Sequence, residues 1–417
     1  MKILFSIGHG RLHLLQAASS LARRGITIRL ILGWAPKQTD GWFVKVCSKI
    51  LRHNLSVSLQ KRKVADPAYV IHQCPEAEFF LHGLLLLAKL FKGLRGCFSF
   101  VGWKCFGWCS RRHIRDADVF HVRSGAGQGG ALIRAKKRGM KVLVDHSMAH
   151  PGYIEKHLRS VYDSYLETLE LGISTPLFRL VAKDCEMADV LLVNSDFVKS
   201  TCVEMGLNGD KIRVVSQGVR ADFFALRKNR AMPHSHSPQP LRLLFTGNFG
   251  FHKGGEYILE AVKMLTEEAG RTVKMDVVGS LYRSDQIIGK YRRFNLPVTF
   301  HGPVLQDDLK AFLQNADIYV FPSLAEGCAS SGMEAMAAGL CVIATYESGL
   351  PITDGETGFI VPAQDAKAIA ERIGWLAEHP AEIDRVGANA ARLIASQYTW
   401  EKYAEKVEAV YRELQTA

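Results

Sequence analysis

The chain has 417 residues, of which 47% are hydrophobic and 23% are charged, so it is long enough for two globular domains. No stretch approaches about 20 uninterrupted apolar residues, which argues against a membrane-spanning helix. The formal net charge is +12, and 19 basic residues against 4 acidic ones lie before Asp116. A segment this basic favours an anionic partner, such as a membrane surface, a lipid phosphate or a nucleic acid.

The N-terminus has the pattern of a β-α-β unit rather than of a signal peptide. A strand over residues 2–7 runs into the turn Gly8-His9-Gly10, and a helix over 12–24 leads to a second strand over 26–32. This order is typical of a doubly wound α/β domain. The third glycine of a dinucleotide fingerprint is missing and no acidic residue ends the second strand, which argues against a dehydrogenase. His9 is either a ligand contact or an ordinary loop residue.

Residues 76–112 combine apolar, aromatic and basic side chains. The run from Phe79 to Lys92 is apolar with a basic end, and five aromatic residues follow between Phe98 and Trp108. One interpretation is a core helix followed by a packed loop. The basic neighbours favour the other, which is a surface that enters the headgroup region of an anionic bilayer.

Polar side chains follow the buried strand predicted at 141–144. This strand delivers Asp145 and His146 to the carboxyl edge of the sheet, where ligands bind in doubly wound folds. His146 is therefore a candidate substrate contact. The alternative is that Asp145 and His146 pair with each other for structural reasons.

A second β-α-β series follows a polar segment, 227–240, which contains three prolines and has the composition of a linker. Its predicted strands cover 241–246 and 273–278. The first strand runs into a glycine-rich turn that contains Lys253 and opens a helix near Glu256. A cation beside the free N–H groups of a helix start forms a natural diphosphate site.

The stretch 321–334 carries the most specific signal. It joins an apolar strand, 316–321, to a helix that stops at Gly339. Glu326 in the loop and Glu334 one turn into the helix can accept hydrogen bonds from sugar hydroxyls, while the amides between them hold an anion. Ser331-x-x-Glu334 is also a capping box, which gives Glu334 a structural alternative that Glu326 lacks.

The Glu-x7-Glu spacing from Glu326 to Glu334, continued by 335–343, resembles that of the retaining nucleotide-sugar glycosyltransferases of family 4. The resemblance implies the GT-B fold, in which two doubly wound, Rossmann-like parallel-sheet domains face each other across a cleft. The implied domains are an acceptor-side domain, a linker, a domain that binds the nucleotide sugar, and a helix that returns to the first domain. Their predicted bounds are 1–226, 227–240, 241–397 and 398–417.

The resemblance also assigns roles to single residues. Glu326, His146 and Lys253 would be the catalytic residues, with Glu326 on the transferred sugar and Lys253 on the diphosphate. Glu334 would bind the ribose of the nucleotide. The further donor-binding positions would be Gly8, Gly10, Asn248, Gly302, Val304, Gly327, Cys328, Ala329, Ser330 and Ser331.

Two positions depart from the family pattern. The usual Asn-Gly-Val-Asp is Gln217-Gly218-Val219-Arg220 here, and Asn248 stands where the family has an arginine. One of the two phosphate-binding cations is therefore missing, and His252 and Arg283 are the candidates to replace it.

These features predict a cytoplasmic, peripheral-membrane, retaining glycosyltransferase that uses a nucleotide sugar and a glycan, glycolipid or other membrane-associated acceptor. No metal cofactor is expected, because helix N-termini and Lys253 can supply the counter-charge for the phosphates. Two alternatives are a nucleotide-sugar hydrolase or epimerase of the same fold and a nucleic-acid-binding protein. The aromatic residues are embedded in apolar runs, which argues against a nucleic-acid partner.

Overall fold

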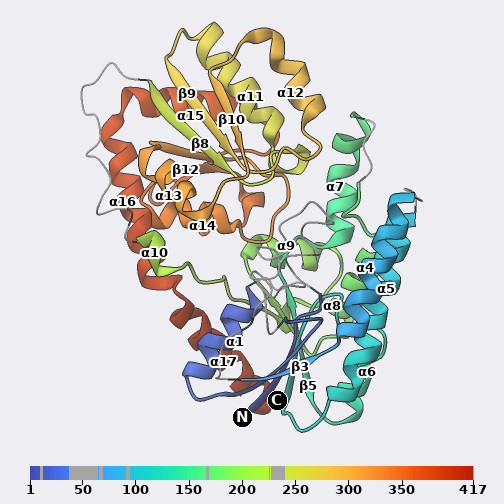
Figure 1. The fold of residues 1–417 in the computed structure, drawn as a ribbon. Helices are drawn as coiled ribbons and strands as arrows, with labels where there is room; N and C mark the ends of the chain where they lie inside the picture. The colour runs from blue at the N-terminus through green and yellow to red at the C-terminus, as the bar shows by residue number, and fades with distance from the viewer. Residues whose placement is uncertain are drawn as a thin grey trace, which may run out of the picture.

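The computed structural model describes residues 1–9, 13–36, 64, 69–90, 94–165, 169–224, 226 and 240–416. In this part of the chain, two α/β domains, each built on a parallel sheet, lie one above the other (Figure 1). The predicted fold class is therefore confirmed.

The N-terminal sheet has seven strands in the order β3-β2-β1-β4-β5-β6-β7. The chain changes direction across the sheet between β1 and β4, and ligands of open α/β sheets bind at the carboxyl ends of the strands near such a point. The strands are β1 (Lys2–Ser6), β2 (Thr27–Leu32), β3 (Val70–Gln73), β4 (Val119–Arg123), β5 (Lys141–His146), β6 (Val190–Val193) and β7 (Ile212–Val214).

Eight α-helices of this domain are described. They are α1 (Leu14–Arg23), α4 (Pro75–Leu90), α5 (Arg95–Ser110), α6 (Ala131–Lys137), α7 (Pro151–Asp163), α8 (Pro176–Met187), α9 (Asp196–Glu204) and α10 (Ala221–Phe224). Helices α4 and α5 pack against each other, and Gly102 of α5 leaves the room that the side chain of Leu81 occupies. Residues 76–112 thus form a pair of helices, so the interpretation of a helix followed by a packed loop is wrong.

The C-terminal sheet has six strands in the order β10-β9-β8-β11-β12-β13. Every residue of β11 is buried, as expected for a parallel strand covered on both faces. The strands are β8 (Leu241–Thr246), β9 (Val273–Val278), β10 (Val298–Gly302), β11 (Ile318–Phe321), β12 (Cys341–Ala344) and β13 (Phe359–Ile360). The α-helices are α11 (Gly255–Lys263), α12 (Asp285–Tyr291), α13 (Gln306–Asn315), α14 (Ser330–Ala337), α15 (Ala366–Glu378) and α16 (Pro380–Gln397).

Helix α16 and the last helix, α17 (Trp400–Thr416), carry the chain back to the N-terminal domain along one side of the molecule (Figure 1). Helix α17 packs against α1, and Glu408 accepts a 2.7 Å hydrogen bond from Arg24. Its apolar face joins the core beneath α1 through Trp400, Tyr403, Val407, Val410, Tyr411 and Leu414. Nearly all of the predicted linker, 227–240, lies outside the described residues, so the exact domain bounds stay predictions.

Among the helices of the described ranges, none combines the length and the apolar character that crossing a bilayer requires.

Candidate active site

A cavity of about 440 Å³ lies where the two domains meet, within the range of roughly 300–1,000 Å³ that small-molecule sites occupy. One wall comes from the N-terminal domain, the segment that leaves β7, and the start of α17. The other wall comes from the loop after β11 and from α14. The lining residues are His13, Ser147, Asn194, Gln217, Gly218, Val219, Arg220 and Trp400 on the first wall, and Glu326, Cys328, Ser330, Met333 and Glu334 on the second.

Glu326 and Lys253 form an ion pair at the second wall. Lys253 ends the short 3-10 turn Phe251–Lys253, and both side chains are 18% exposed. Burial lowers the pKa of Lys253, whereas the adjoining Glu326 carboxylate favours the charged ammonium and opposes that shift. The cation predicted to meet a diphosphate is therefore held beside the carboxylate predicted to meet the sugar.

A glycine is required immediately after Lys253. Gly254 has a φ of +72° and is the N-cap of α11, and a Cβ at this position would overlap the carbonyl oxygen of Pro322. The close approach of these two loops places Lys253 next to the loop that carries Glu326.

Glu334 does not belong to a capping box. The N-cap of α14 is Ala329, which has no side-chain cap, and the hydroxyl of Ser331 accepts a 2.9 Å hydrogen bond from Tyr319. The structural alternative for Glu334 is therefore wrong.

The Glu334 carboxylate lines the cavity and accepts no hydrogen bond from any residue that the structure describes. Burial raises the pKa of Glu334 to about 7, an effect that nearby Arg220 opposes and Asp222 reinforces. Arg220 itself is held by hydrogen bonds of 2.6 and 3.1 Å to the Asp222 carboxylate.

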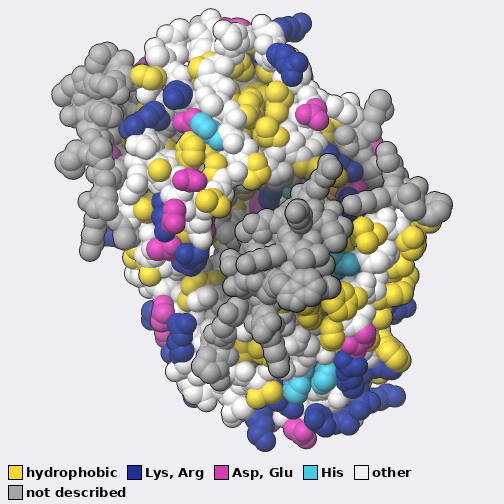
Figure 2. Space-filling view, in the orientation of Figure 1, with side chains coloured by type: hydrophobic (Ala, Val, Ile, Leu, Met, Phe, Trp, Pro, Cys, Tyr) yellow, Lys and Arg dark blue, Asp and Glu magenta, His cyan; other side chains and the backbone are white. Residues whose placement is uncertain are grey.

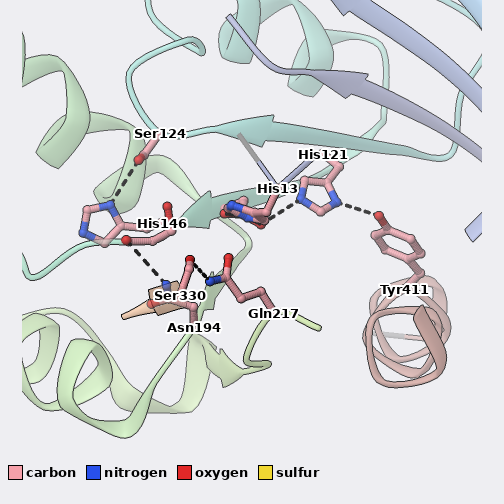
Figure 3. Close-up of polar contacts among 10 residues, drawn as sticks. His13, His121, Ser124, His146, Asn194, Gln217, Ser330 and Tyr411 are labelled. Atoms are coloured by element: carbon pink, nitrogen blue, oxygen red, sulfur yellow. Dashed lines mark hydrogen bonds and ion pairs between the residues drawn. The ribbon is translucent and has the colours of Figure 1, made fainter. Parts of the chain in front are cut away.

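His146 is fully buried and is not among the residues that line the cavity. Its Nδ1 lies 3.1 Å from the hydroxyl of Ser124, and burial lowers its pKa to about 3, so the imidazole is neutral (Figure 3). Asp145 does not pair with it, because Asp145 contacts His13 and His121. The predicted pairing of Asp145 with His146 is therefore wrong, because Asp145 has other partners. The role of His146 as a substrate contact stays a prediction, and its side chain does not line this cavity.

The other predicted donor-binding residues lie in several places. Cys328 and Ser330 line the cavity, Gly327 touches Ser147 of the opposite domain, and Ala329 caps α14. The predicted positions that line neither this cavity nor the one described next are Gly327, Ala329 and Ser331, together with Gly8, which packs against Trp103, Gly302 at the end of β10, and Val304 just after it. Gly10 lies outside the described residues.

Asn248 lines a second, smaller interdomain cavity of about 130 Å³ together with His252 and Arg283. Burial lowers the pKa of His252 to about 3, so this side chain is neutral at physiological pH. Arg283 remains a cation, and its guanidinium lies 3.0 Å from Glu170 of the N-terminal domain. Of the two candidates to replace the missing arginine, the structure thus favours Arg283.

Comparison with known proteins gives the family. Residues 11–223 match the family model described as Glycosyltransferase Family 4, and residues 240–379 match the one described as Glycosyl transferases group 1. The chain belongs to glycosyltransferase family 4. Its two facing Rossmann-like domains have the GT-B arrangement.

Three proteins illustrate the similarity of this glycosyltransferase. The MMP alpha-(1->4)-mannosyltransferase of Mycolicibacterium hassiacum is 26% identical over 71% of this chain and 70% of its own. The D-inositol 3-phosphate glycosyltransferase of Streptomyces scabiei is 32% identical, but the match spans only 48% of each chain. Anabaena Alr3699/HepE, solved in complex with UDP and glucose, is 15% identical, with a TM-score of 0.62 over 99% of this chain and 100% of its own.

The two domains of the glycosyltransferase are in direct contact around the cavity. The hydroxyl of Ser195 donates a hydrogen bond to the carbonyl of Gly327, and Gln217 donates one to the hydroxyl of Ser330. Phe197 and Tyr346 meet edge to face with ring centroids 5.7 Å apart. These contacts describe a closed form of the cleft.

Several lining residues were not predicted as site residues from the sequence. Gln217 and Arg220 depart from the family pattern, and that departure was a usable signal. His13 lies three residues after Gly10 of the glycine turn, whereas the histidine singled out from the sequence was His9, whose ring is packed against Trp103 and Phe106. The sequence around Trp400 did not indicate its position, because the residues at the start of α17 do not reveal that this side chain lines the cavity between the two domains.

Proposed function

We propose that this protein is a retaining glycosyltransferase that moves a sugar from a nucleotide-sugar donor to a carbohydrate or lipid-linked acceptor. The observation that carries the proposal is the interdomain cavity whose second wall presents the carboxylates of Glu326 and Glu334. Sugar hydroxyls are hydrogen-bond donors, and these carboxylates can accept from them. The glycosyl-transferring relatives and the fold shared with HepE, which was solved with UDP and glucose, agree with this assignment.

In the proposed reaction, Glu326 holds the hydroxyls of the transferred sugar and Glu334 holds the ribose. Lys253, Arg283 and the N-terminus of α14 offset the negative charge of the diphosphate, so that no metal ion is required. Retention of configuration needs no protein nucleophile in this scheme. The leaving phosphate accepts the proton of the attacking hydroxyl on the same face of the sugar.

A thermal-shift screen of nucleotide sugars tests the proposal, since a ligand that binds the folded state raises the melting temperature. One nucleotide sugar should stabilise the protein, and its sugar should then be transferred when acceptor sugars are added. Donor cleavage that is equally fast with and without acceptor would instead support a hydrolase or epimerase. Tight oligonucleotide binding with no response to any nucleotide sugar would contradict the proposal.

Lys253→Ala should weaken the binding of a nucleoside diphosphate by roughly 1.5–3 kcal/mol, the contribution of a charge-assisted hydrogen bond. The loss has two causes, because the variant removes a cation and leaves the Glu326 carboxylate to repel the phosphates. Isothermal titration calorimetry measures the change. Lys263→Ala is the control, because Lys263 is comparably buried but pairs with Glu260 of α11 and lines neither cavity, and equal affinities for both variants would rule out the assigned role.

A membrane-facing surface is the second part of the proposal. Figure 2 shows hydrophobic side chains along the edge that α4 and α5 form, at the right of the view, with Lys and Arg at its lower end. Phe79 and Leu86 of α4 and Trp108 of α5 are each about 60% exposed. The guanidinium of Arg111 lies 5.4 Å from the Trp108 ring, which places a cation beside an apolar anchor. We propose that this surface holds the enzyme on the inner face of the cell membrane, where it meets its acceptor.

Binding to vesicles should therefore require anionic lipid and should weaken as salt rises, because surface charges are screened within about 8 Å at physiological ionic strength. Phe79→Ser and Trp108→Ser should each lower the bound fraction in a vesicle co-sedimentation assay. The control is Leu305→Ser, which removes an even more exposed apolar side chain, at 76%, from the C-terminal domain. Equal binding to neutral vesicles, or none to either kind, would count against this surface.

A further inference from the structure

The loop after β9 lies against the turn that carries Asn248. The backbone N–H of Phe249 donates a 2.8 Å hydrogen bond to the carbonyl of Ser280. A Cβ at Gly279 would overlap the carbonyl oxygen of Gly247, so the two segments can approach this closely only because a glycine stands there. A side chain from the loop after β9 can therefore reach the space that a side chain at position 248 faces.

Asn248 and Arg283 line the same interdomain cavity of about 130 Å³. In the family pattern an arginine occupies position 248, and its longer side chain would enter this cavity with its positive charge. Asparagine leaves that space open, and Arg283 faces it from the neighbouring loop. The cavity thus keeps a cation, which is supplied from a different place in the chain.

Arg283 has an uncommon backbone conformation. Its φ is +61°, in the left-handed region that residues other than glycine adopt rarely and at a cost in free energy. The N–H of Ser284 donates a 3.1 Å hydrogen bond to the carbonyl of Leu281, which closes a tight turn around Arg283. Strained residues of this kind cluster at functional sites, and here the turn directs a cation into a cavity between the domains.

The carboxylate that meets Arg283 belongs to the other domain. Helix α7 reaches from the N-terminal domain toward the C-terminal one (Figure 1), and Glu170 lies in the segment after it. Oε1 of Glu170 accepts a 3.0 Å hydrogen bond from the guanidinium. The Arg283 side chain is 29% exposed and that of Glu170 is 45% exposed, so this ion pair contributes little to stability. A diphosphate, which has more charge and more acceptor oxygens than one carboxylate, can replace Glu170 in it.

The other cation expected at the diphosphate, Lys253, also has a carboxylate partner. That partner is Glu326, which belongs to the same domain and moves with it. Glu170 differs, because it approaches Arg283 only when the two domains are together. A closed cleft therefore brings a competitor to the phosphate-binding arginine, and an open cleft removes it.

We propose that Arg283 exchanges between two anions, the carboxylate of Glu170 and the diphosphate of the nucleotide, and that Glu170 thereby promotes release of the nucleoside diphosphate product. This inference rests on the proposed function and adds to it a residue of the N-terminal domain that controls the donor site. Before transfer, the donor is also held by Glu326 through its sugar. The product has lost that sugar, so competition from Glu170 displaces the product more readily than the donor.

The test measures how the full-length protein binds the nucleoside diphosphate of the donor found in the screen, by isothermal titration calorimetry. Glu170→Gln keeps the size of the side chain and removes its charge. It should tighten binding about twofold to fivefold, the factor that corresponds to a partly exposed ion pair, and the product should inhibit this variant correspondingly more strongly. The control is Glu204→Gln, which removes an exposed carboxylate of the same domain that lines neither cavity, and it should match the wild type.

Arg283→Ala should weaken diphosphate binding by about tenfold or more, because a charge-assisted hydrogen bond is lost. Asn248→Arg in this background returns a cation to the same cavity, so the affinity should recover to within about threefold of the wild type. In the wild-type background the same substitution should add little, because two guanidinium groups in one small cavity repel each other. A purely structural role for Arg283 predicts no such recovery. If Arg283→Ala does not fold, the gain expected of Glu170→Gln still decides the question.

Unchanged or weaker diphosphate binding by Glu170→Gln would overturn the inference, and weaker binding would identify the ion pair as a clamp on the closed cleft. An Arg283→Ala protein with wild-type affinity, or with a defect that Asn248→Arg does not repair, would overturn it as well. A failure of the proposed function differs from all of these results, since the wild-type protein would then bind neither a nucleotide sugar nor a nucleoside diphosphate.

Discussion

Glu326→Gln is expected to cut turnover by more than tenfold while the protein stays folded. Glutamine keeps the shape and volume of the side chain but loses the charge that accepts hydrogen bonds from the transferred sugar. A tenfold loss corresponds to about 1.4 kcal/mol of transition-state stabilisation. Turnover with the identified donor and the melting temperature are the two measurements.

The ion pair with Lys253 changes the stability expected for this variant. The sequence suggested an isolated carboxylate in a loop between buried elements, whose removal would leave stability unchanged or raise it. The structure instead pairs Glu326 with Lys253, and both side chains are largely buried. Without Glu326, no carboxylate beside Lys253 offsets the effect of burial, so the pKa of Lys253 in the folded state should fall further below its unfolded value. The folded state should then be somewhat less stable than that of the wild type. We therefore expect a modestly lower melting temperature below the unfolded pKa of lysine, where the unfolded chain binds the proton that the folded state gives up.

Glu356→Gln is the matched control, because Glu356 is an exposed glutamate of the same domain. It should leave both turnover and melting temperature unchanged. A Glu326→Gln protein that melts much earlier, yet keeps full specific activity when folded, would make Glu326 a structural residue and would remove the main support for the proposed function.

Gly327→Ala is expected to lower turnover by about tenfold or more without unfolding either domain, since about 1.4 kcal/mol against the closed form suffices for that loss. A Cβ at Gly327 would overlap the carbonyl oxygen of Ser147 and would lie 2.7 Å from Nδ2 of Asn194. Both atoms belong to the opposite domain. The strain can therefore be relieved by opening the cleft, which separates the two cavity walls.

Small-angle X-ray scattering and turnover together test this prediction, because an opened cleft increases the radius of gyration. The control is Gly289→Ala in α12, where a Cβ would meet no atom within 4 Å. A Gly327→Ala enzyme with wild-type turnover would show that the contact with Ser147 is not part of the active form.

The sequence predicted local elements better than contacts between them. Strands β8 and β9 begin and end at the predicted residues, because apolar runs bounded by loops define buried strands. The capping box predicted from Ser331 and Glu334 is not formed, for a different reason. Its spacing is correct, but the hydroxyl of Ser331 meets Tyr319 of β11, and a pattern of neighbouring residues does not reveal such a partner.

Asp145 and His146 show the same limit. Strand β5 continues through both residues, and successive side chains on a strand point to opposite faces of the sheet, so the two cannot pair. The partners of Asp145 come from the start of α1 and from β4, and those of His146 from the end of β4. The sequence thus located this edge of the sheet as a candidate site but did not show that His13, and not His146, reaches the cavity.

The helix that crosses back to the N-terminal domain affects how the protein is made. The core beneath α1 is completed by Trp400, Tyr403 and Tyr411 of α17. On the ribosome, these residues follow β1 and β2 by about 370 residues, an interval of roughly 20–75 s at about 5–20 residues per second. Throughout that time the first domain has an incomplete core with apolar surface open to water. Chaperone assistance during translation should therefore matter more for this half of the molecule than for the second, which is synthesised later but closes its own core first.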